Sequence, residues 1–215
     1  MTVLRLPPTD LSPGVAGLVL AAGRSTRMSG GSKLLADFRD TTVIQEVVST
    51  ALAADLDPIV VVVRKEDAGV RAALEGVPVR FAVPPPVPEG RMVSVVAGIL
   101  ALEDRSMSGA MLLLGDEPGL DPDHVRTVRR AAESAASVVL RATYRDRPGH
   151  PVYVPETVLR SIPDLSLQHG PDAGLWDVIV RSGLPHRGVP LEALSPIDID
   201  TRDDLSRAVD REAHA

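Results

Sequence analysis

The residues best suited to do chemistry follow an apolar segment near the start of the chain. Residues 15–20 predict a buried strand, and the small residues 21–23 come directly after it. Arg24, Arg27 and Lys33 then place three positive side chains in the following loop. Small residues let backbone N–H groups approach a ligand closely, and α/β proteins bind phosphates at the carboxyl ends of such strands. We therefore predict that this loop holds a nucleoside triphosphate.

Two common phosphate-binding patterns do not fit this loop. Lys33 stands between Ser32 and Leu34, so the Gly-Lys-Ser/Thr ending of a Walker loop is missing. Only Gly23 follows the strand closely, so the G-x-G-x-x-G turn of dinucleotide-binding domains is missing too. On composition alone, a solvated connection that happens to carry Arg and Lys remains an alternative.

Carboxylates gather in two later segments. Asp116 follows the apolar run 110–114, where one carboxylate at the end of a central strand suits a divalent-cation site facing the first loop. An N-cap of the next turn is the alternative for this residue. Residues 197–199 predict a strand whose isoleucines are buried, so that Asp198 and Asp200 are presented together on the other face. Thr201 then caps a final helix, with Asp204 as its third residue.

The elements that must position these residues alternate along the chain. Continuous apolar runs predict strands at 58–63, 77–83, 110–114 and 137–143. Amphipathic segments predict helices at 66–74 and 92–102, and another helix starting at Asp121-Pro122. A further helix opens at Thr42, and its predicted buried face carries Val43, Val47, Val48 and Leu52. This alternation predicts an α/β fold with a doubly wound, mostly parallel sheet in three layers. We expect residues 1–13 to be a flexible leader and residues 14–215 to form one domain.

Composition excludes several classes of protein. The 215 residues carry a formal net charge of −6 and only 2% aromatic residues, so we expect neither nucleic acid nor an anionic membrane as a partner. The absence of cysteine excludes disulfides, thiolate metal sites and cysteine nucleophiles. No signal peptide and no apolar stretch of about 20 residues is evident, which predicts a cytoplasmic protein.

Four ordered motifs resemble one enzyme family. They are L-A-A-G-x-S-x-R-M with K-L-L in residues 20–35, G-D-x-P in 115–118, G-H-P-V in 149–152 and D-I-D-T in 198–201. This order resembles the MobA-like NTP transferases, which include molybdopterin cytidylyl- and guanylyltransferases and sugar-phosphate nucleotidyltransferases. The resemblance implies a Rossmann-like fold of the nucleotide-diphospho-sugar transferase type.

The resemblance also implies an activity. It is transfer of CMP from CTP to a phosphomonoester acceptor such as the molybdenum cofactor, with Mg²⁺ as cofactor and release of pyrophosphate. Ala22 favours CTP, because in this family L-A-A-G accompanies pyrimidine nucleotides and a methyl group crowds a purine. A client molybdoenzyme is a further partner. The alternatives are guanylyl or other nucleotidyl transfer to a different acceptor, a non-catalytic cofactor-binding or insertion chaperone, and an oxidoreductase on a recruited nucleotide fold.

The same resemblance assigns roles to individual residues. Arg27, Lys33 and Asp116 are the expected catalytic residues. The expected nucleotide-binding residues are Leu20, Ala21, Ala22, Gly23, Arg24, Ser25, Arg27, Lys33, Gly90 and Ser94. Gly98 continues the Gly/Ser spacing near the base. The expected acceptor-binding residues are Gly149, His150, Pro151 and Asp172, and the expected metal ligands are Asp116, Asp198 and Asp200. We expect Trp176 to pack against the core.

Overall fold

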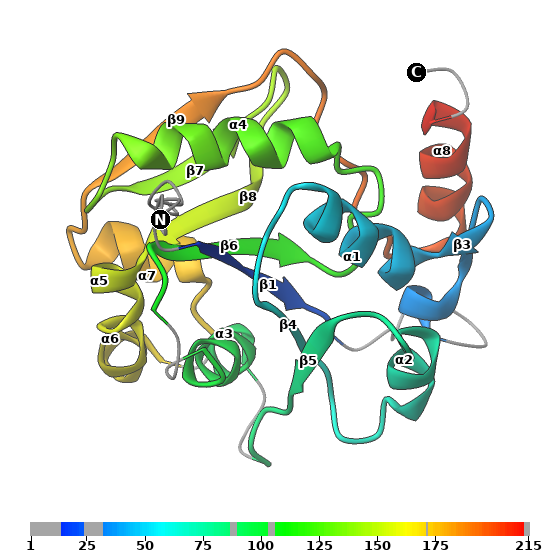
Figure 1. Ribbon diagram of the computed structural model, residues 1–215, viewed down its shortest axis with the longest axis horizontal. Helices are drawn as coiled ribbons and strands as arrows, with labels where there is room; N and C mark the ends of the chain where they lie inside the picture. The colour runs from blue at the N-terminus through cyan, green and yellow to red at the C-terminus, as the bar shows by residue number, and fades with distance from the viewer. Residues whose placement is uncertain (1–13, 24–31, 87–89, 103–105, 171, 213–215) are drawn as a thin grey trace, which may run out of the picture.

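The computed structural model describes residues 14–23, 32–86, 90–102, 106–170 and 172–212. Within these ranges, a seven-stranded sheet runs through the centre in the order β5-β4-β1-β6-β8-β7-β9, with helices on both faces (Figure 1). The α/β architecture with a mostly parallel sheet confirms the predicted fold class. None of the described helices has the length and apolar character needed to cross a bilayer.

One strand breaks the parallel arrangement of the sheet. β8 runs antiparallel to both of its neighbours, β6 and β7, whereas β1 is parallel to β4 and β6. A separate two-stranded hairpin, β2–β3, precedes the first α-helix. The strand bounds are β1 Val15–Leu20, β2 Asp37–Phe38, β3 Thr41–Thr42, β4 Ile59–Val62, β5 Val79–Ala82, β6 Gly109–Leu114, β7 Val139–Thr143, β8 Pro148–Pro155 and β9 His186–Pro190.

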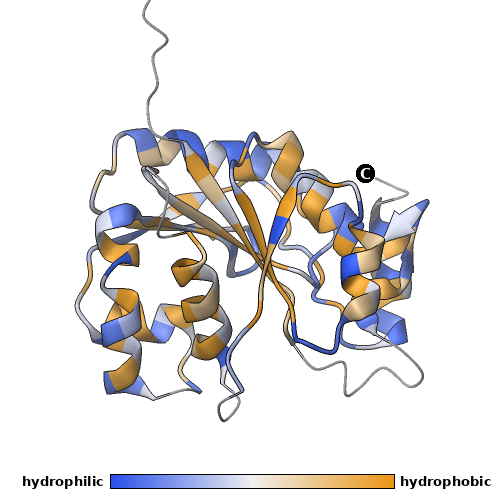
Figure 2. Cartoon of the chain, turned by 60° about the horizontal axis from the view of Figure 1, so that its bottom comes forward, coloured by the Kyte–Doolittle hydropathy of each residue, from blue (hydrophilic) through white to orange (hydrophobic). Residues whose placement is uncertain are grey.

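The helices form two layers, one on each face of the sheet (Figure 2). One layer holds α1 Val43–Ala53, α2 Ala68–Ala73, α4 Pro122–Glu133 and α8 Arg202–Glu212. The other holds α3 Arg91–Leu100, α5 Glu156–Leu159, α6 Ile162–His169 and α7 Leu175–Arg181. A short 3₁₀ helix, η1 Lys33–Leu35, lies between the first loop and the hairpin.

The two layers arise from strand geometry. Successive side chains of a strand point to opposite faces, so a fully apolar strand contributes to two cores. In β1, Leu18 belongs to the core beneath α3, and Val19 belongs to the core beneath α1. Val62 and Val61 of β4 divide in the same way. All four side chains are fully buried, which explains why continuous apolar runs identified these strands.

Two local predictions were wrong. Residues 197–199 form no strand; the segment makes one backbone bond to the end of β6, from Ile199 N to Asp116 O at 2.9 Å. Ile199 is nevertheless fully buried, although this segment makes no row of hydrogen bonds with any neighbouring strand that the structure describes. Leu52 is 36% exposed, because the buried face of α1 runs through Val48 and Ala51 instead. The capping boxes at Thr42 and Thr201 are confirmed.

Candidate active site

The loops after β1 and β6 meet at the point where the chain reverses its direction across the sheet. From β1 the chain proceeds to β4 and β5 on one side, then returns to β6 on the other. Gly115 N donates to Leu20 O at 2.9 Å, and a Cβ on Gly115 would lie 3.0 Å from the Ala21 Cβ. The absence of a side chain at Gly115 therefore lets the two strand ends touch. Open α/β sheets bind ligands in the crevice at such a switch point.

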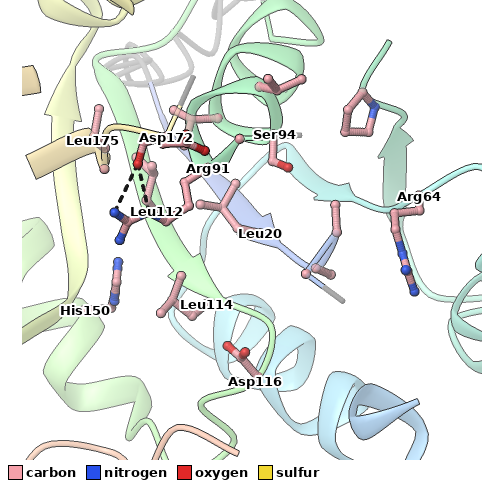
Figure 3. A pocket seen from close by; sticks show the side chains of 18 of the residues that line it. Leu20, Arg64, Arg91, Ser94, Leu112, Leu114, Asp116, His150, Asp172 and Leu175 are labelled. Atoms are coloured by element: carbon pink, nitrogen blue, oxygen red, sulfur yellow. Dashed lines mark hydrogen bonds between the residues drawn. The ribbon is translucent and has the colours of Figure 1, made fainter. Parts of the chain in front are cut away.

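A large cavity opens at this switch point. Its volume is about 1310 Å³, which exceeds the roughly 300–1,000 Å³ of an ordinary small-molecule site and leaves room for two substrates. In Figure 3, His150 and Asp172 lie on one side of the cavity and Arg64 on the other, with Asp116 at the end of the β6 ribbon. The predicted site residues that line it are Leu20, Ala21, Ala22, Gly23, Lys33, Gly90, Ser94, Asp116, His150 and Asp172.

Asp198 and Asp200 do not line the cavity and lie beside Lys33 instead. The other predicted residues fall into three groups. Arg24, Ser25 and Arg27 lie outside the described residues. Gly149 and Pro151 flank His150 in β8 without lining the cavity themselves. Gly98 is buried in α3 against Leu18 and Val62 and does not line the cavity. Its place in the helix is explained by close packing on the sheet.

Lys33 joins the two acidic segments at the edge of the cavity. Its Nζ lies 2.5 Å from Asp116 Oδ2, 2.9 Å from Asp200 Oδ1 and 4.0 Å from Asp198 Oδ1. The Lys33 side chain is 7% exposed, because η1 directs it inward. Burial alone would lower the pKa of Lys33, but the ion pairs with Asp116 and Asp200 outweigh burial and raise it. The side chain is therefore held in its charged form.

The cluster formed by Asp116, Asp198 and Asp200 brings three carboxylates close to the Lys33 ammonium. Partial burial, reinforced by the Asp116 carboxylate, raises the pKa of Asp198 to about 6. Carboxylate oxygens are the donors that Mg²⁺ and Mn²⁺ prefer, so the donor set fits a divalent cation. Among the residues placed by the structure, no three His, Asp or Glu groups already surround one point as ligands. The fit therefore rests on donor chemistry and charge.

The opposite wall of the cavity is built around His150. Its backbone oxygen accepts a hydrogen bond from the Tyr144 hydroxyl at 2.6 Å, and its Nδ1 faces the buried carboxylate of Glu117 at 3.5 Å. Burial raises the pKa of the Tyr144 phenol, which keeps this hydroxyl a donor. Asp172 takes part through its main chain, since its carbonyl accepts from Arg91 Nε and Nη2 at 3.3 and 3.1 Å.

Several cationic and aromatic residues of the cavity were not among the predicted site residues. Arg64 and Lys65 come directly after β4, so the rule that placed the first loop at a strand end would also have found them. The guanidinium of Arg141 lies 4.8 Å from the centre of the Trp176 ring, and both side chains line the cavity. Trp176 also packs against the core, as predicted. No local pattern pairs these two residues, which belong to β7 and α7.

Comparisons with known proteins agree with this geometry. A family model described as the MobA-like NTP transferase domain matches residues 17–184. A probable molybdenum cofactor guanylyltransferase of Natronomonas pharaonis is 28% identical over 203 residues, covering 91% of this chain and 96% of the relative. A nicotine blue oxidoreductase of Paenarthrobacter nicotinovorans is 30% identical over 154 residues, covering 68% of this chain and 72% of the relative.

A solved structure is similar over almost the whole chain. The crystal structure of Rv0371c from Mycobacterium tuberculosis has a TM-score of 0.79 at 31% identity, covering 93% of this chain and 99% of that one. A manganese complex of Rv0371C is also known; it has a TM-score of 0.74 at 27% identity, covering 92% and 98%. The similarity therefore includes the strand ends that form the cavity as well as the core.

Proposed function

Because this chain belongs to the MobA-like NTP transferase family and is a nucleotidyltransferase acting on a phosphate acceptor, we propose that it transfers CMP from CTP to a phosphomonoester. The proposed acceptor is the molybdenum cofactor or a compound like it, and pyrophosphate is released. The observation that supports this most strongly is the cluster of Lys33, Asp116, Asp198 and Asp200 at the edge of a cavity lined by the L-A-A-G segment.

The nucleotide would lie along the loop after β1. Backbone N–H groups of Ala22 and Gly23 approach a triphosphate closely because these side chains are small, whereas the N–H of Ala21 donates to Val62 O at 2.9 Å within the sheet. Lys33, Arg64 and Lys65 supply positive charge at the ends of β1 and β4. Lys33 has three donor hydrogens, so it can hold carboxylates and a phosphate oxygen together. Arg27 is proposed for the same role from its place in the motif.

The acceptor would lie between the triphosphate and the wall formed by His150 and Asp172. Its phosphate oxygen attacks the α-phosphorus in line, a P–O bond to that oxygen forms, and the bond to the departing pyrophosphate breaks. Positioning and charge stabilisation dominate such a transfer, so no side-chain nucleophile is needed. Asp116 with Asp198 and Asp200 would hold Mg²⁺, which when bound neutralises charge on the phosphates. Arg91, fixed by the Asp172 carbonyl, lies beside the acceptor space.

CTP is the proposed donor because of Ala22, which lines the cavity. One methyl group against a ring discriminates by roughly 1–3 kcal/mol, or about 10–200-fold. Guanylyl transfer is the second candidate, favoured by the similarity to the Natronomonas guanylyltransferase. A client molybdoenzyme and a cytoplasmic location stay predictions from the sequence.

Pyrophosphate release tests the proposal directly. The purified chain is incubated with Mg²⁺ or Mn²⁺, each of the four NTPs, and a panel of phosphomonoesters that includes molybdopterin. We expect release with CTP and one acceptor, and none when the acceptor or the metal is omitted. If GTP is the one NTP that supports release in the presence of an acceptor, the group transferred is GMP and the CTP proposal is wrong. No release with any NTP, together with consumption of a nicotinamide cofactor, would favour a redox activity like that of the oxidoreductase relative.

A further inference from the structure

Glu117 carries a buried carboxylate that the proposed reaction does not use. The residue follows Asp116 at the end of β6 and is only 5% exposed. Within the described ranges, its Oε2 atom is buried and accepts no hydrogen bond. A buried acceptor without a donor destabilises the folded state, so an apolar side chain of the same shape would give a more stable fold. The carboxylate therefore calls for an explanation other than stability.

The side chain that faces this orphan oxygen is His150. Nδ1 of the imidazole lies 3.5 Å from Glu117 Oε2, which is within ion-pair range but longer than a hydrogen bond. The two residues come from adjoining parts of the sheet, because β6 and β8 are paired strands. The backbone of His150 is fixed separately, by the hydroxyl of Tyr144. The backbone that carries the imidazole is thus held in place, and the Glu117 carboxylate faces the Nδ1 side of the ring.

We propose that Glu117 is a positioning residue that accepts a hydrogen bond from the Nδ1–H of His150 and so presents Nε2 to the acceptor substrate. Carboxylates commonly fix the tautomer and orientation of a functional histidine in this way, because the two ring nitrogens are distinct. The side chain of His150 is 24% exposed and lines the cavity, so Nε2 is the ring nitrogen left for a ligand. This role rests on the proposed function, which places the acceptor beside His150.

The tautomer of His150 is measurable without any substrate. In ¹⁵N spectra of histidine-labelled protein, recorded where the ring is neutral, the His150 signals are assigned by their loss in His150→Gln. We expect the proton on Nδ1 in the wild-type protein and in Glu117→Gln, whose amide oxygen still accepts. In Glu117→Leu, which has no acceptor, we expect a mixture of tautomers. A proton on Nε2 in the wild-type protein would overturn the proposal.

Kinetics then separate positioning from a structural role. In Glu117→Leu we expect the KM for the acceptor to rise about tenfold while the KM for the NTP stays within about twofold, since only the acceptor wall is altered. Glu117→Gln should restore most of the acceptor affinity. The matched control is Glu192→Leu, which removes the same charge from a side chain that is 86% exposed. It should leave both KM values unchanged.

The outcomes distinguish this proposal from the proposed function. An unchanged acceptor KM in both Glu117 variants would overturn the positioning role while leaving nucleotidyl transfer intact. If no NTP is turned over at all, the tautomer still tests the Glu117–His150 contact. A mixture of tautomers in Glu117→Leu supports the contact, and an unchanged spectrum contradicts it. If Glu117→Leu fails to fold, a structural requirement is shown and the proposal fails unless Glu117→Gln keeps the wild-type tautomer and acceptor KM.

Discussion

The Lys33 ammonium lies beside three aspartates, and the carboxylates gathered there determine the chemistry open to the site. Its ammonium pairs most closely with Asp116 and Asp200, while Asp198 lies farther away. Ionised carboxylates repel a triphosphate, and a divalent cation bound between them reduces this repulsion. The same cluster that attracts a divalent cation therefore makes nucleotide binding depend on that cation.

Asp116→Asn should abolish turnover while leaving the fold largely intact. The substitution removes the carboxylate nearest the Lys33 ammonium but keeps a similar side chain volume. We expect kcat to fall by at least roughly a hundredfold, because an amide is a poor ligand for a hard cation and the charge balance changes. Circular dichroism checks that the fold is intact, and pyrophosphate release measures the loss of turnover. Asp203→Asn, at an 86% exposed position on α8, is the matched control. Full activity of Asp116→Asn would refute the metal assignment.

The helix α3 depends on a glycine to lie close to the sheet. A Cβ at Gly98 would overlap Leu18 Cδ1 and lie 2.9 Å from Val62 Cγ2, and both neighbours are fully buried. The approach of α3 sets the wall that carries Gly90 and Ser94, both of which line the cavity. Helix packing and site geometry are thus coupled at this residue.

Gly98→Ala should destabilise the protein although alanine is the better helix former. Overpacking costs about 1–3 kcal/mol, and the gain in helix propensity offsets up to about 1 kcal/mol of it. We expect the free energy of unfolding in urea to fall by about 1–2 kcal/mol. Gly23→Ala is the comparison for stability, because no atom of the described residues beyond its chain neighbours lies within 4 Å of its added Cβ. A gain in stability for Gly98→Ala would show that the helix can shift.

The turn after β7 is tied to the segment before α8 by Asp146. Its two carboxylate oxygens accept from Ser195 N at 2.8 Å and Ser195 Oγ at 2.7 Å. These hydrogen bonds, first that of the Ser195 hydroxyl and then that of its N–H, lower the pKa of Asp146 below its ordinary 3.8. The bonds hold together two segments that lie far apart in the sequence.

The contribution of Asp146 to the free energy of unfolding should decrease as the pH falls. Because its pKa is lower in the folded protein, the ionised group stabilises the fold above its ordinary pKa, and this contribution is lost as the pH falls below about 3.8. We expect wild type to be more stable than Asp146→Asn at pH 7, with the difference shrinking below about pH 4. Urea unfolding of both proteins across this range measures it. A difference that widens on acidification would contradict this assignment.

The cavity is a property of the whole molecule. Its lining comes from the ends of β1 and β4 on one side of the switch point and from β6, β7, β8 and α7 on the other. A ligand that contacts both sides stabilises the folded state by mass action, by about 2.7 kcal/mol at a hundred times its Kd. Binding should therefore be visible as thermal stabilisation of the entire chain.

CTP and Mn²⁺ together should raise the melting temperature more than the sum of their separate effects. The cation neutralises the aspartate cluster, and the triphosphate then meets less repulsion. For a chain of this size we expect a combined shift of roughly 5–10 °C at saturating ligand. Differential scanning fluorimetry provides the measurement, and Asp116→Asn should lose the cooperative part of the shift. Separate effects that merely add would contradict coupling through the carboxylates.

Much of the fold could be predicted because its signals are local. Val61 and Val62 belong to a β-branched run that only a strand covered on both faces explains, and the capping pairs Thr42–Gln45 and Thr201–Asp204 lie within one helical turn. The first loop and Asp116 were recognised because each follows such a strand. Arg64 could have been found by the same rule, whereas Arg141 and Trp176 could not, because their pairing joins β7 to α7.

The sequence by itself therefore determined strands β1, β4, β5, β6 and β7, the caps, the family motifs and the expectation that acidic and basic residues meet at strand ends. Only the tertiary structure decided that Lys33 lies on the aspartates, that Gly98 serves packing, and that Glu117 faces His150. The physical reason is the sequence separation over which each interaction acts. Periodicity and capping act over a few residues, whereas the 2.9 Å contact between Lys33 and Asp200 joins positions 167 residues apart and depends on the order in which the strands pair.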